Sequence, residues 1–458
     1  KIRDKYDCNW TLLDLKALKP SEKITIENPK RQITQITAGK LIEMIEKNKL
    51  TIAASGGLFR SDKRSVVCDV LSDWFDKRVG YKDKMKDAYK VKKDPVLGEF
   101  YNKRQHAFKI KLNDVYGCFA QNGWRYTDGY KVISNAITLT GQRLIKESII
   151  EMNRMINSEI GTEDVDYVIT SDTDSMFIRV GDVVRYRWPD LDVSDRDARI
   201  AKILEIASDY QKQINKYLNK HVRDLFNIQD DHYFELKQEV ILERGYFAGK
   251  RRYAQYIINK EGVTTEELDI KGLDLMKSNF PPLFKKFGEH IINEIMFGKS
   301  KTDIDKQILD FRNEIRTIGW KHILKPTGLK KMSEYLAGPP SAGEIFSKIK
   351  LKCPINTKAA IYTNDVLRFK KLDKKYPTIK EFEKIYYVYL KDNPYRLDCI
   401  GFFGVDDPPE IIEFIEKYVD KEKTFDSTFL NKLQGVYDDL KWSFPSLNEY
   451  ANKFFVIS

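Results

Sequence analysis

The chain has 458 residues, of which 42% are hydrophobic and 32% are charged, so it is long enough for two to four domains or subdomains. Lysine and arginine exceed aspartate and glutamate by 79 minus 68, a net charge of +11, which favours a polyanionic partner. The five cysteines form no Cys-x-x-Cys pair and no run approaches 18 apolar residues, which argues against a zinc site, a disulfide framework and a membrane-spanning helix.

Two helical segments are the first elements with a clear pattern. From Ser65 to Tyr89 apolar residues recur at helical spacing, and a second helical run extends from Glu99 to Asn122. The Asp94-Pro95 pair between them marks a break, because the residue before a proline is disfavoured in helical conformation. Gly80 weakens the first helix by about 1 kcal/mol relative to alanine. The pattern predicts a helical hairpin.

Each arm of this hairpin carries a polar face. Arg78 and Lys82 are four residues apart, and Lys109, Asn113 and Tyr116 follow helical spacing on the second arm. A triphosphate requires several cations that converge on one place, with arginine as a planar fork and lysine as a point charge. Tyr116 precedes a glycine and so offers a flat surface for a base pair. Solvated helix faces and a core tyrosine are the alternatives on spacing alone.

A short acidic turn follows. Its flanks, residues 167–170 and 176–180, are rich in β-branched and apolar residues, which predicts two strands joined by a tight turn. Side chains two apart in an extended strand face the same way, so we expect Asp172 and Asp174 within a few ångströms of each other. Two such carboxylates stay ionised when a cation shares the site, and Mg²⁺ is the natural candidate. An Asx turn with solvated carboxylates is the alternative.

These segments and two more downstream resemble the motifs of family B DNA polymerases, most closely those of tailed bacteriophages. The motifs occur in the family's order and at family-like separations. They are Arg78-x-x-x-Lys82-x-x-Met85, Lys109-Ile-Lys-Leu-Asn113-Asp-Val-Tyr116-Gly117, Ser171-Asp-Thr-Asp174-Ser, Lys250-Arg251-Arg252-Tyr253-Ala254 and Lys271-Gly272-Leu-Asp274. Asp114 stands where the family usually has serine, and Thr170-Ser171 replaces its Tyr-Gly. Similarity at Cys353-Pro354, at 393–400 and in the closing residues extends the resemblance over most of the chain.

The resemblance implies an α+β fold with the right-hand architecture of polymerases. In that architecture an antiparallel β palm holds the catalytic carboxylates, a helical hairpin forms the fingers, and a mostly helical thumb grips the duplex. The segments expected are residues 1–63 as the N-terminal part of the palm, 64–122 as the fingers, 123–275 as the palm with its Asp-Thr-Asp hairpin, and 276–458 as the thumb with a C-terminal tail.

The resemblance also implies template-directed DNA synthesis, in which two Mg²⁺ ions, or Mn²⁺ as a substitute, assist the addition of a dNTP to a primer 3′ end. The implied metal ligands are Asp172, Asp174 and Glu239, with Glu235 and Glu243 as near alternatives to the last. Asp172, Asp174 and Lys109 are the implied catalytic residues. The incoming nucleotide would contact Arg78, Lys82, Lys109, Asn113 and Tyr116. The primer-template DNA would contact Lys250, Arg251, Arg252, Tyr253, Lys271 and Gly272.

Two parts of the family pattern are missing from the sequence. The Asp-x-x-Ser-Leu-Tyr-Pro-Ser strand, which supplies a third aspartate, does not precede the expected fingers, and neither does an exonuclease domain. We therefore expect a C-terminal portion of a divided polymerase, whose partner chain carries the exonuclease and the first palm aspartate. The alternative, of another class, is a non-catalytic subunit that grips primer-template DNA.

The end of the chain, Leu447 to Ser458, includes the aromatic pair Phe454-Phe455. By resemblance this tail is expected to bind a sliding clamp, and docking into the protein's own core is the alternative. The scattered cysteines and the lack of a leader or apolar span lead us to expect a cytoplasmic protein, in the host-cell cytoplasm if a phage encodes it.

Overall fold

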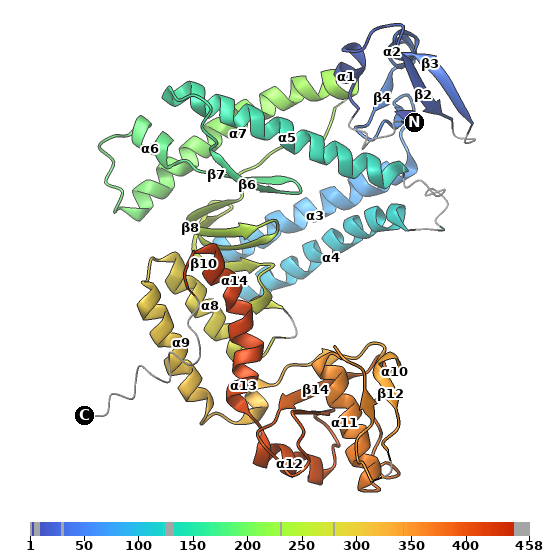
Figure 1. The fold of residues 1–458 in the computed structure, drawn as a ribbon. Helices are drawn as coiled ribbons and strands as arrows, with labels where there is room; N and C mark the ends of the chain where they lie inside the picture. Colours follow the sequence, from blue (N-terminus) through green and yellow to red (C-terminus); the bar gives the residue numbers. More distant parts are fainter. Residues whose placement is uncertain are drawn as a thin grey trace. The chain divides into compact units, whose positions relative to one another are not determined.

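The computed structural model describes residues 2–3, 10–28, 32–121, 123, 132–229, 231–277, 280–341 and 343–443. The chain divides into two compact units, residues 1–239 and 240–458. Long helices accompany several small sheets, and every strand pair among the described residues is antiparallel. This confirms the α+β class (Figure 1). No helix in the described part of the chain is long and apolar enough to cross a bilayer.

Unit one begins with a three-stranded sheet in the order β1-β2-β3, two short helices and a hairpin. The elements are β1 (Ile2–Arg3), α1 (Leu12–Lys16), β2 (Lys23–Glu27), β3 (Ile33–Thr37), α2 (Ala38–Lys47), β4 (Leu50–Ile52) and β5 (Leu58–Arg60). Leu15, Leu41, Ile45 and Ile52 are fully buried between them. These apolar contacts give the N-terminal part of the unit a core of its own.

The predicted helical hairpin is present as α3 (Val66–Lys90) and α4 (Pro95–Ala120), which pack along each other (Figure 1). The second helix begins at Pro95, four residues before the expected start at Glu99. The Asp94 side chain accepts a hydrogen bond from the Leu97 amide at 2.9 Å and so caps this helix. Proline suits the first helical position, where its missing N–H has no partner to lose.

The rest of unit one is built on three helices and a hairpin: α5 (Val132–Ile160), β6 (Val168–Asp172), β7 (Ser175–Ile178), α6 (Gly181–Arg187) and α7 (Arg196–Phe226). Their apolar faces share one core, which includes Ile156, Tyr167 and Ile206. Beside this core, the Arg187 guanidinium donates to both Glu159 oxygens at 2.6 and 3.0 Å and to Asp209 at 2.8 Å. The Tyr210 hydroxyl donates to Glu159 at 2.9 Å, which completes the network.

Unit two opens with a three-stranded meander in the order β10-β9-β8, built from β8 (Val240–Gly249), β9 (Arg252–Lys260) and β10 (Val263–Lys271). Helical elements pack on it: η1 (Asp274–Met276), α8 (Pro282–Met296), α9 (Lys301–Ile315), α13 (Lys421–Phe425), η3 (Asp426–Leu430) and α14 (Asn431–Asp439). Their core is rich in phenylalanine, with Phe284, Phe425 and Phe429 fully buried.

A second group of elements lies between α9 and α13 in the chain. It comprises η2 (Trp320–Ile323), β11 (Thr327–Gly328), α10 (Met332–Tyr335), β12 (Leu336–Gly338), β13 (Lys348–Ile349), α11 (Ile355–Phe369), β14 (Lys384–Tyr389), β15 (Cys399–Phe402) and α12 (Pro409–Tyr418). The strands form a sheet in the order β11-β14-β15 and the separate pair β12-β13. Residues 276–458, expected to be mostly helical, therefore also carry two small sheets.

Candidate functional site

The acidic turn lies at the end of a β-hairpin. Asp172 is the last residue of β6 and pairs with Ser175, the first of β7, so Thr173 and Asp174 form the connection. The Asp174 amide donates to the Asp172 carbonyl oxygen at 2.6 Å, which closes a turn of only three residues. Thr173 lies at its centre with φ of 56°, in the left-handed region. The two predicted strands joined by a tight turn are confirmed.

The reason we gave for bringing the two carboxylates together was wrong. Asp174 lies in the turn and not in an extended strand, so the alternation of side chains along a strand does not apply to this pair. What places both carboxylates at one tip is the tightness of the turn itself. Asp174 is exposed and Asp172 is half-buried, and the Thr173 hydroxyl donates to a carboxylate oxygen of Asp172 at 2.9 Å.

The Asn153 side chain of α5 holds the base of this hairpin. Asn153 Oδ1 accepts hydrogen bonds from the backbone amides of Tyr167 at 2.9 Å and Val168 at 3.2 Å. Its Nδ2 donates to Asp166 at 2.8 Å. Tyr167 is 1% exposed and packs in the core that α5 shares with α7. The base of the hairpin is thus fixed to α5 by hydrogen bonds as well as by apolar packing.

The carboxylate pair suits a magnesium ion in its chemistry. Mg²⁺ prefers oxygen ligands and commonly takes one or two carboxylates, with water and substrate phosphates completing its shell. Within the described ranges, no group of three or more His, Cys, Asp or Glu side chains could hold a metal ion. Of the two carboxylates, that of Asp174 is the exposed one. Glu239 is exposed and ends unit one directly before β8.

The predicted nucleotide-binding residues lie on α3 and α4. Arg78 and Lys82 are half-buried on α3, and Arg78 Nε is buried with no hydrogen-bond partner among the described residues. Lys109 and Asn113 are exposed on α4. A buried guanidinium N–H without a partner is costly, which makes an anion beside Arg78 favourable.

Tyr116 connects these helices to the scaffold of the acidic hairpin. Its ring is 42% exposed, and its hydroxyl lies 2.9 Å from the Thr138 hydroxyl on α5. Helix α5 contacts α4, β6 and β7. The predicted nucleotide-binding helix and the Asp172–Asp174 turn are therefore mounted on the same helix of unit one.

The predicted DNA-contacting residues all gather at one place in unit two. Lys250 and Arg251 form the two-residue connection between β8 and β9, and Arg252 is the first residue of β9. Lys271, at the end of β10, pairs with Tyr253. Two motifs that lie 20 residues apart in the chain thus meet, and we call them the basic tip (Lys250, Arg251, Arg252, Tyr253, Lys271 and Gly272).

Lys271 of the basic tip makes an ion pair with Asp269. Lys271 Nζ lies 2.9 Å from an Asp269 oxygen, and the hydrogen bond to this carboxylate raises the pKa of Lys271. Gln255 Nε2 donates to the other Asp269 oxygen at 2.8 Å, so Asp269 is held between two strands. Lys250, Arg251, Arg252 and Lys271 are all exposed. The tip therefore presents positive charge to solvent.

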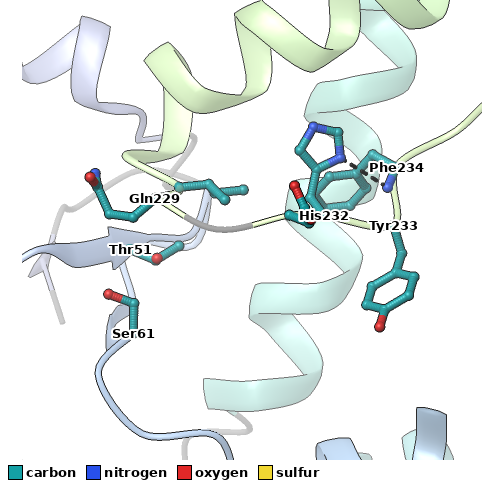
Figure 2. Close-up of a pocket in the computed structure, with 8 residues that line it drawn as sticks. Thr51, Ser61, Gln229, His232, Tyr233 and Phe234 are labelled. Atoms are coloured by element: carbon teal, nitrogen blue, oxygen red, sulfur yellow. Dashed lines mark hydrogen bonds between the residues drawn. The ribbon is translucent and has the colours of Figure 1, made fainter.

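Sequence reasoning missed Asn153 and Asp269, because neither belongs to a motif and each also bonds to a residue on another element, Asn153 to Tyr167 and Asp269 to Gln255. It also missed a cavity of about 390 Å³ between the β4–β5 hairpin and the segment after α7. Figure 2 shows its lining, to which Thr51, Ser61, Gln229, His232, Tyr233 and Phe234 contribute. The His232 Nδ1 atom accepts a hydrogen bond from the Phe234 amide at 3.3 Å. None of the predicted site residues lines this cavity.

Comparison with known proteins identifies the family. A sequence model described as "DNA polymerase family B" matches residues 22–394. The chain is 23% identical over 351 residues to the DNA-directed DNA polymerase of Enterobacteria phage T4 and 23% identical over 394 residues to that of Escherichia phage RB69. It is also 25% identical over 256 residues to a DNA polymerase alpha catalytic subunit of Sterkiella nova.

These matches cover a larger share of this chain than of its relatives. They cover 73% of this chain and 37% of the T4 protein, 79% and 40% for the RB69 protein, and 55% and 14% for the Sterkiella protein. The chain thus spans about two fifths of the length of the phage relatives. The family match extends over far more than half of the chain. The protein therefore belongs to DNA polymerase family B and is related to the phage enzymes.

Proposed function

We propose that this chain is the polymerase portion of a template-directed DNA polymerase, which adds dNTPs to a primer 3′ end by two-metal-ion nucleotidyl transfer. The observation that carries the proposal is the Asp172–Thr173–Asp174 turn of a family B chain, whose hairpin is mounted on the same helix as α4. Asp174 is open to ligands at this tip.

The proposed roles follow from the chemistry of each side chain. Asp172 and Asp174 would hold Mg²⁺, or Mn²⁺ in its place, with Glu239 as a further candidate ligand. When bound, the two ions supply charge stabilisation to the attacking and leaving oxygens of an in-line displacement. Most of the protein's own contribution is to position the reactants and to place charge near them.

The cations of α3 and α4 would neutralise the triphosphate. Arg78 offers a planar fork with a buried N–H that lacks a partner, and Lys82 and Lys109 offer point charges. Asn113 and Tyr116 follow Lys109 along α4 by four and seven residues and would line the new base pair. The hydrogen bond between the Tyr116 hydroxyl and the Thr138 hydroxyl restricts the orientation of the Tyr116 ring.

The basic tip would hold primer-template DNA through the phosphate backbone of the DNA. Exposed lysine and arginine at a hairpin end can contact phosphates without reading the base sequence, which is what a polymerase requires. We assign residues 1–63 and 123–275 to the palm, 64–122 to the fingers and 276–458 to the thumb of the right-hand architecture. The compact units divide after residue 239, inside the proposed palm range.

The chain would act together with an N-terminal polymerase and exonuclease region, on a partner chain or on an upstream segment. In support, the described residues offer a pair of carboxylates at the tip, where the family employs a third. Clamp binding by residues 447–458 is retained as a proposal, and this tail lies outside the described residues.

A second candidate is a non-catalytic subunit that grips primer-template DNA. The exposed basic tip favours it. The two candidates differ in whether Asp174 matters for synthesis once the chain is supplied with its partner.

Primer extension distinguishes them. The chain and the candidate N-terminal polypeptide are assayed separately and together, with Mg²⁺, dNTPs and a labelled primer-template. We expect synthesis from the mixture and a loss of about 100-fold or more in Asp174→Asn, with primer-template affinity unchanged. Asp164→Asn, an exposed turn aspartate of the same unit with φ of 53°, is the matched control and should leave synthesis intact. Full synthesis by Asp174→Asn would refute catalysis here, and full synthesis by the chain alone would refute the division.

A further inference from the structure

A row of aromatic rings covered by cations runs along α3 and α4. Lys111 Nζ lies 5.2 Å from the ring centre of Phe108 and 5.6 Å from that of Trp74. The Arg104 guanidinium lies 4.6 Å from the ring centre of Phe100 and 5.8 Å from that of Tyr81, and Lys84 Nζ also lies 5.8 Å from Tyr81. We call this set the ring–cation row (Trp74, Tyr81, Lys84, Phe100, Tyr101, Arg104, Phe108 and Lys111).

The rings of the row join the two helices. Tyr81 of α3 stacks with Phe108 of α4 at 5.8 Å and with Tyr101 of α4 at 6.3 Å between ring centres. Phe100 meets Tyr101 edge-on at 5.3 Å and remains 48% exposed. Cation stems cover these rings where a larger core would place apolar side chains. Of these rings, Phe100 is the exposed one and thus offers surface to a ligand, while Trp74, Tyr81, Tyr101 and Phe108 are half-buried.

The α4 part of the ring–cation row is separate from the proposed triphosphate-binding face. Successive residues of an α-helix are turned by about 100°, so Lys111 points about 200° away from Lys109. Arg104 and Lys111 are seven residues apart and share one face, whereas Lys109 and Asn113 share another. On α3, by contrast, Trp74 and Tyr81 lie four and three residues from Arg78 and share its face. The second surface on this hairpin is therefore formed by the α4 part of the row.

The cations of the row are not neutralised by the protein. Within the described ranges, Lys84, Arg104 and Lys111 make no ion pair, whereas three neighbouring lysines do. Those pairs are Lys77 with Asp73 at 2.7 Å, Lys92 with Asp87 at 3.0 Å and Lys103 with Glu99 at 3.8 Å. Unpaired positive charge thus lies beside the aromatic rings, and charge complementarity favours a negatively charged partner.

We infer that the ring–cation row binds single-stranded DNA. Single strands combine regularly spaced phosphates with planar bases, and proteins that hold them without sequence preference pair cations with aromatic stacking surfaces. An acidic peptide would satisfy the charges and leave the rings without a stacking partner. The inference goes beyond the proposed catalytic site and does not depend on it.

The test measures binding of a fluorescent oligothymidylate of about 16 nucleotides by anisotropy, without Mg²⁺ or dNTPs. In Arg104→Gln/Lys111→Gln we expect about tenfold weaker binding at low salt, and a log–log salt slope that is smaller by about 1.4 because two phosphate contacts are lost. Lys92→Gln/Lys103→Gln removes the same charge from ion-paired positions of the hairpin, and we expect less than a twofold change.

A second variant separates stacking from charge. Phe100→Leu keeps an apolar side chain, and we expect about fivefold weaker binding with the salt slope unchanged, because a base–ring contact is worth about 1–3 kcal/mol. An oligothymidylate carrying 5-iodouracil should cross-link to the peptides that contain Phe100 and Phe108. Equal losses in both double variants, an unchanged Phe100→Leu variant, or displacement of the oligonucleotide by an equal concentration of polyglutamate would overturn the inference. The Asp174→Asn chain should bind the oligonucleotide normally, so a failure of the catalytic proposal is distinguishable.

Discussion

Gly272 lies so close to Arg251 that a Cβ atom added to residue 272 would be 1.8 Å from the Arg251 carbonyl oxygen. Gly272 also has φ of 65°, a conformation that L side chains rarely adopt. The end of β10 is therefore seated directly on the connection between β8 and β9. This contact fixes the two motifs of the basic tip to each other, and it explains why a glycine follows Lys271.

We expect Gly272→Ala to destabilise unit two by more than 2 kcal/mol, since it combines backbone strain with a clash against main-chain atoms. Chemical denaturation followed by tryptophan fluorescence measures the loss. Gly262→Ala is the matched control, because Gly262 has φ of 77° and open space around it. It should cost about 1 kcal/mol, the conformational penalty alone. Equal losses in the two variants would contradict the importance of the Arg251 contact.

Asn153→Ala should weaken the attachment of the acidic hairpin to α5. The variant removes the acceptor of the Tyr167 amide, at a cost of about 1–3 kcal/mol, while the Val168 amide keeps the Asp166 carboxylate at 3.1 Å as a second acceptor. Hydrogen exchange followed by NMR should show the largest increase in exchange rate at the Tyr167 amide, and a smaller one at the Val168 amide. If their protection is unchanged, Asn153 does not hold the hairpin.

Glu159 should make the free energy of unfolding depend on pH. Hydrogen bonds from the Arg187 guanidinium lower the pKa of the Glu159 carboxyl below its usual value. Because this pKa is lower in the folded than in the unfolded protein, the ionised carboxylate stabilises the fold at pH values above the usual glutamate pKa. The stabilisation is lost as the pH falls through the pKa of Glu159 in the folded protein.

The free energy of unfolding of Glu159→Gln should thus lie about 2 kcal/mol below that of the wild type at pH 7. The difference should shrink as both proteins are titrated toward pH 3. Glu205→Gln breaks an exposed pair with Lys202 and should change stability by less than about 0.5 kcal/mol at either pH. A constant difference for Glu159→Gln over this range would rule out titration of the carboxylate as the cause.

Lys109→Gln should raise the KM for dNTP about tenfold or more in the reconstituted polymerase, because one cation facing the triphosphate is lost. Its thermal stability should match the wild type, since Lys109 is exposed. Steady-state incorporation of a single nucleotide provides the measurement. Lys103→Gln, on another face of α4, is the control and should keep the wild-type KM. If the two variants behave alike, Lys109 has no specific contact with the nucleotide.

The local elements of unit one were predictable because the chain marks them strongly. Ser65 and Asp94 are capping residues at the starts of α3 and α4, and each side chain accepts a hydrogen bond from the first turn of its helix. Polar residues between two runs of β-branched residues predicted the acidic hairpin. These signals depend on neighbours in the sequence, and the structure confirms them.

The features that escaped prediction depend on contacts between distant residues. Nothing near Asn153 in the sequence indicates that its amide accepts from two residues of a later strand. The strands β11, β12 and β13 have only two or three residues each, too few for an alternating pattern. The unpaired cations of the ring–cation row became visible only when α3 and α4 were packed together.

The α3–α4 hairpin has few buried residues, and this affects how unit one unfolds. Among its described residues, the buried ones are Ala88 and Gly98 near the connection and Phe119 near the opposite end of α4. Its middle is therefore held by backbone hydrogen bonds and stacked rings, while the cohesion of unit one resides in other helices. We therefore expect substitutions along that middle to change how often the two helices separate locally, with little effect on the temperature at which the whole unit unfolds.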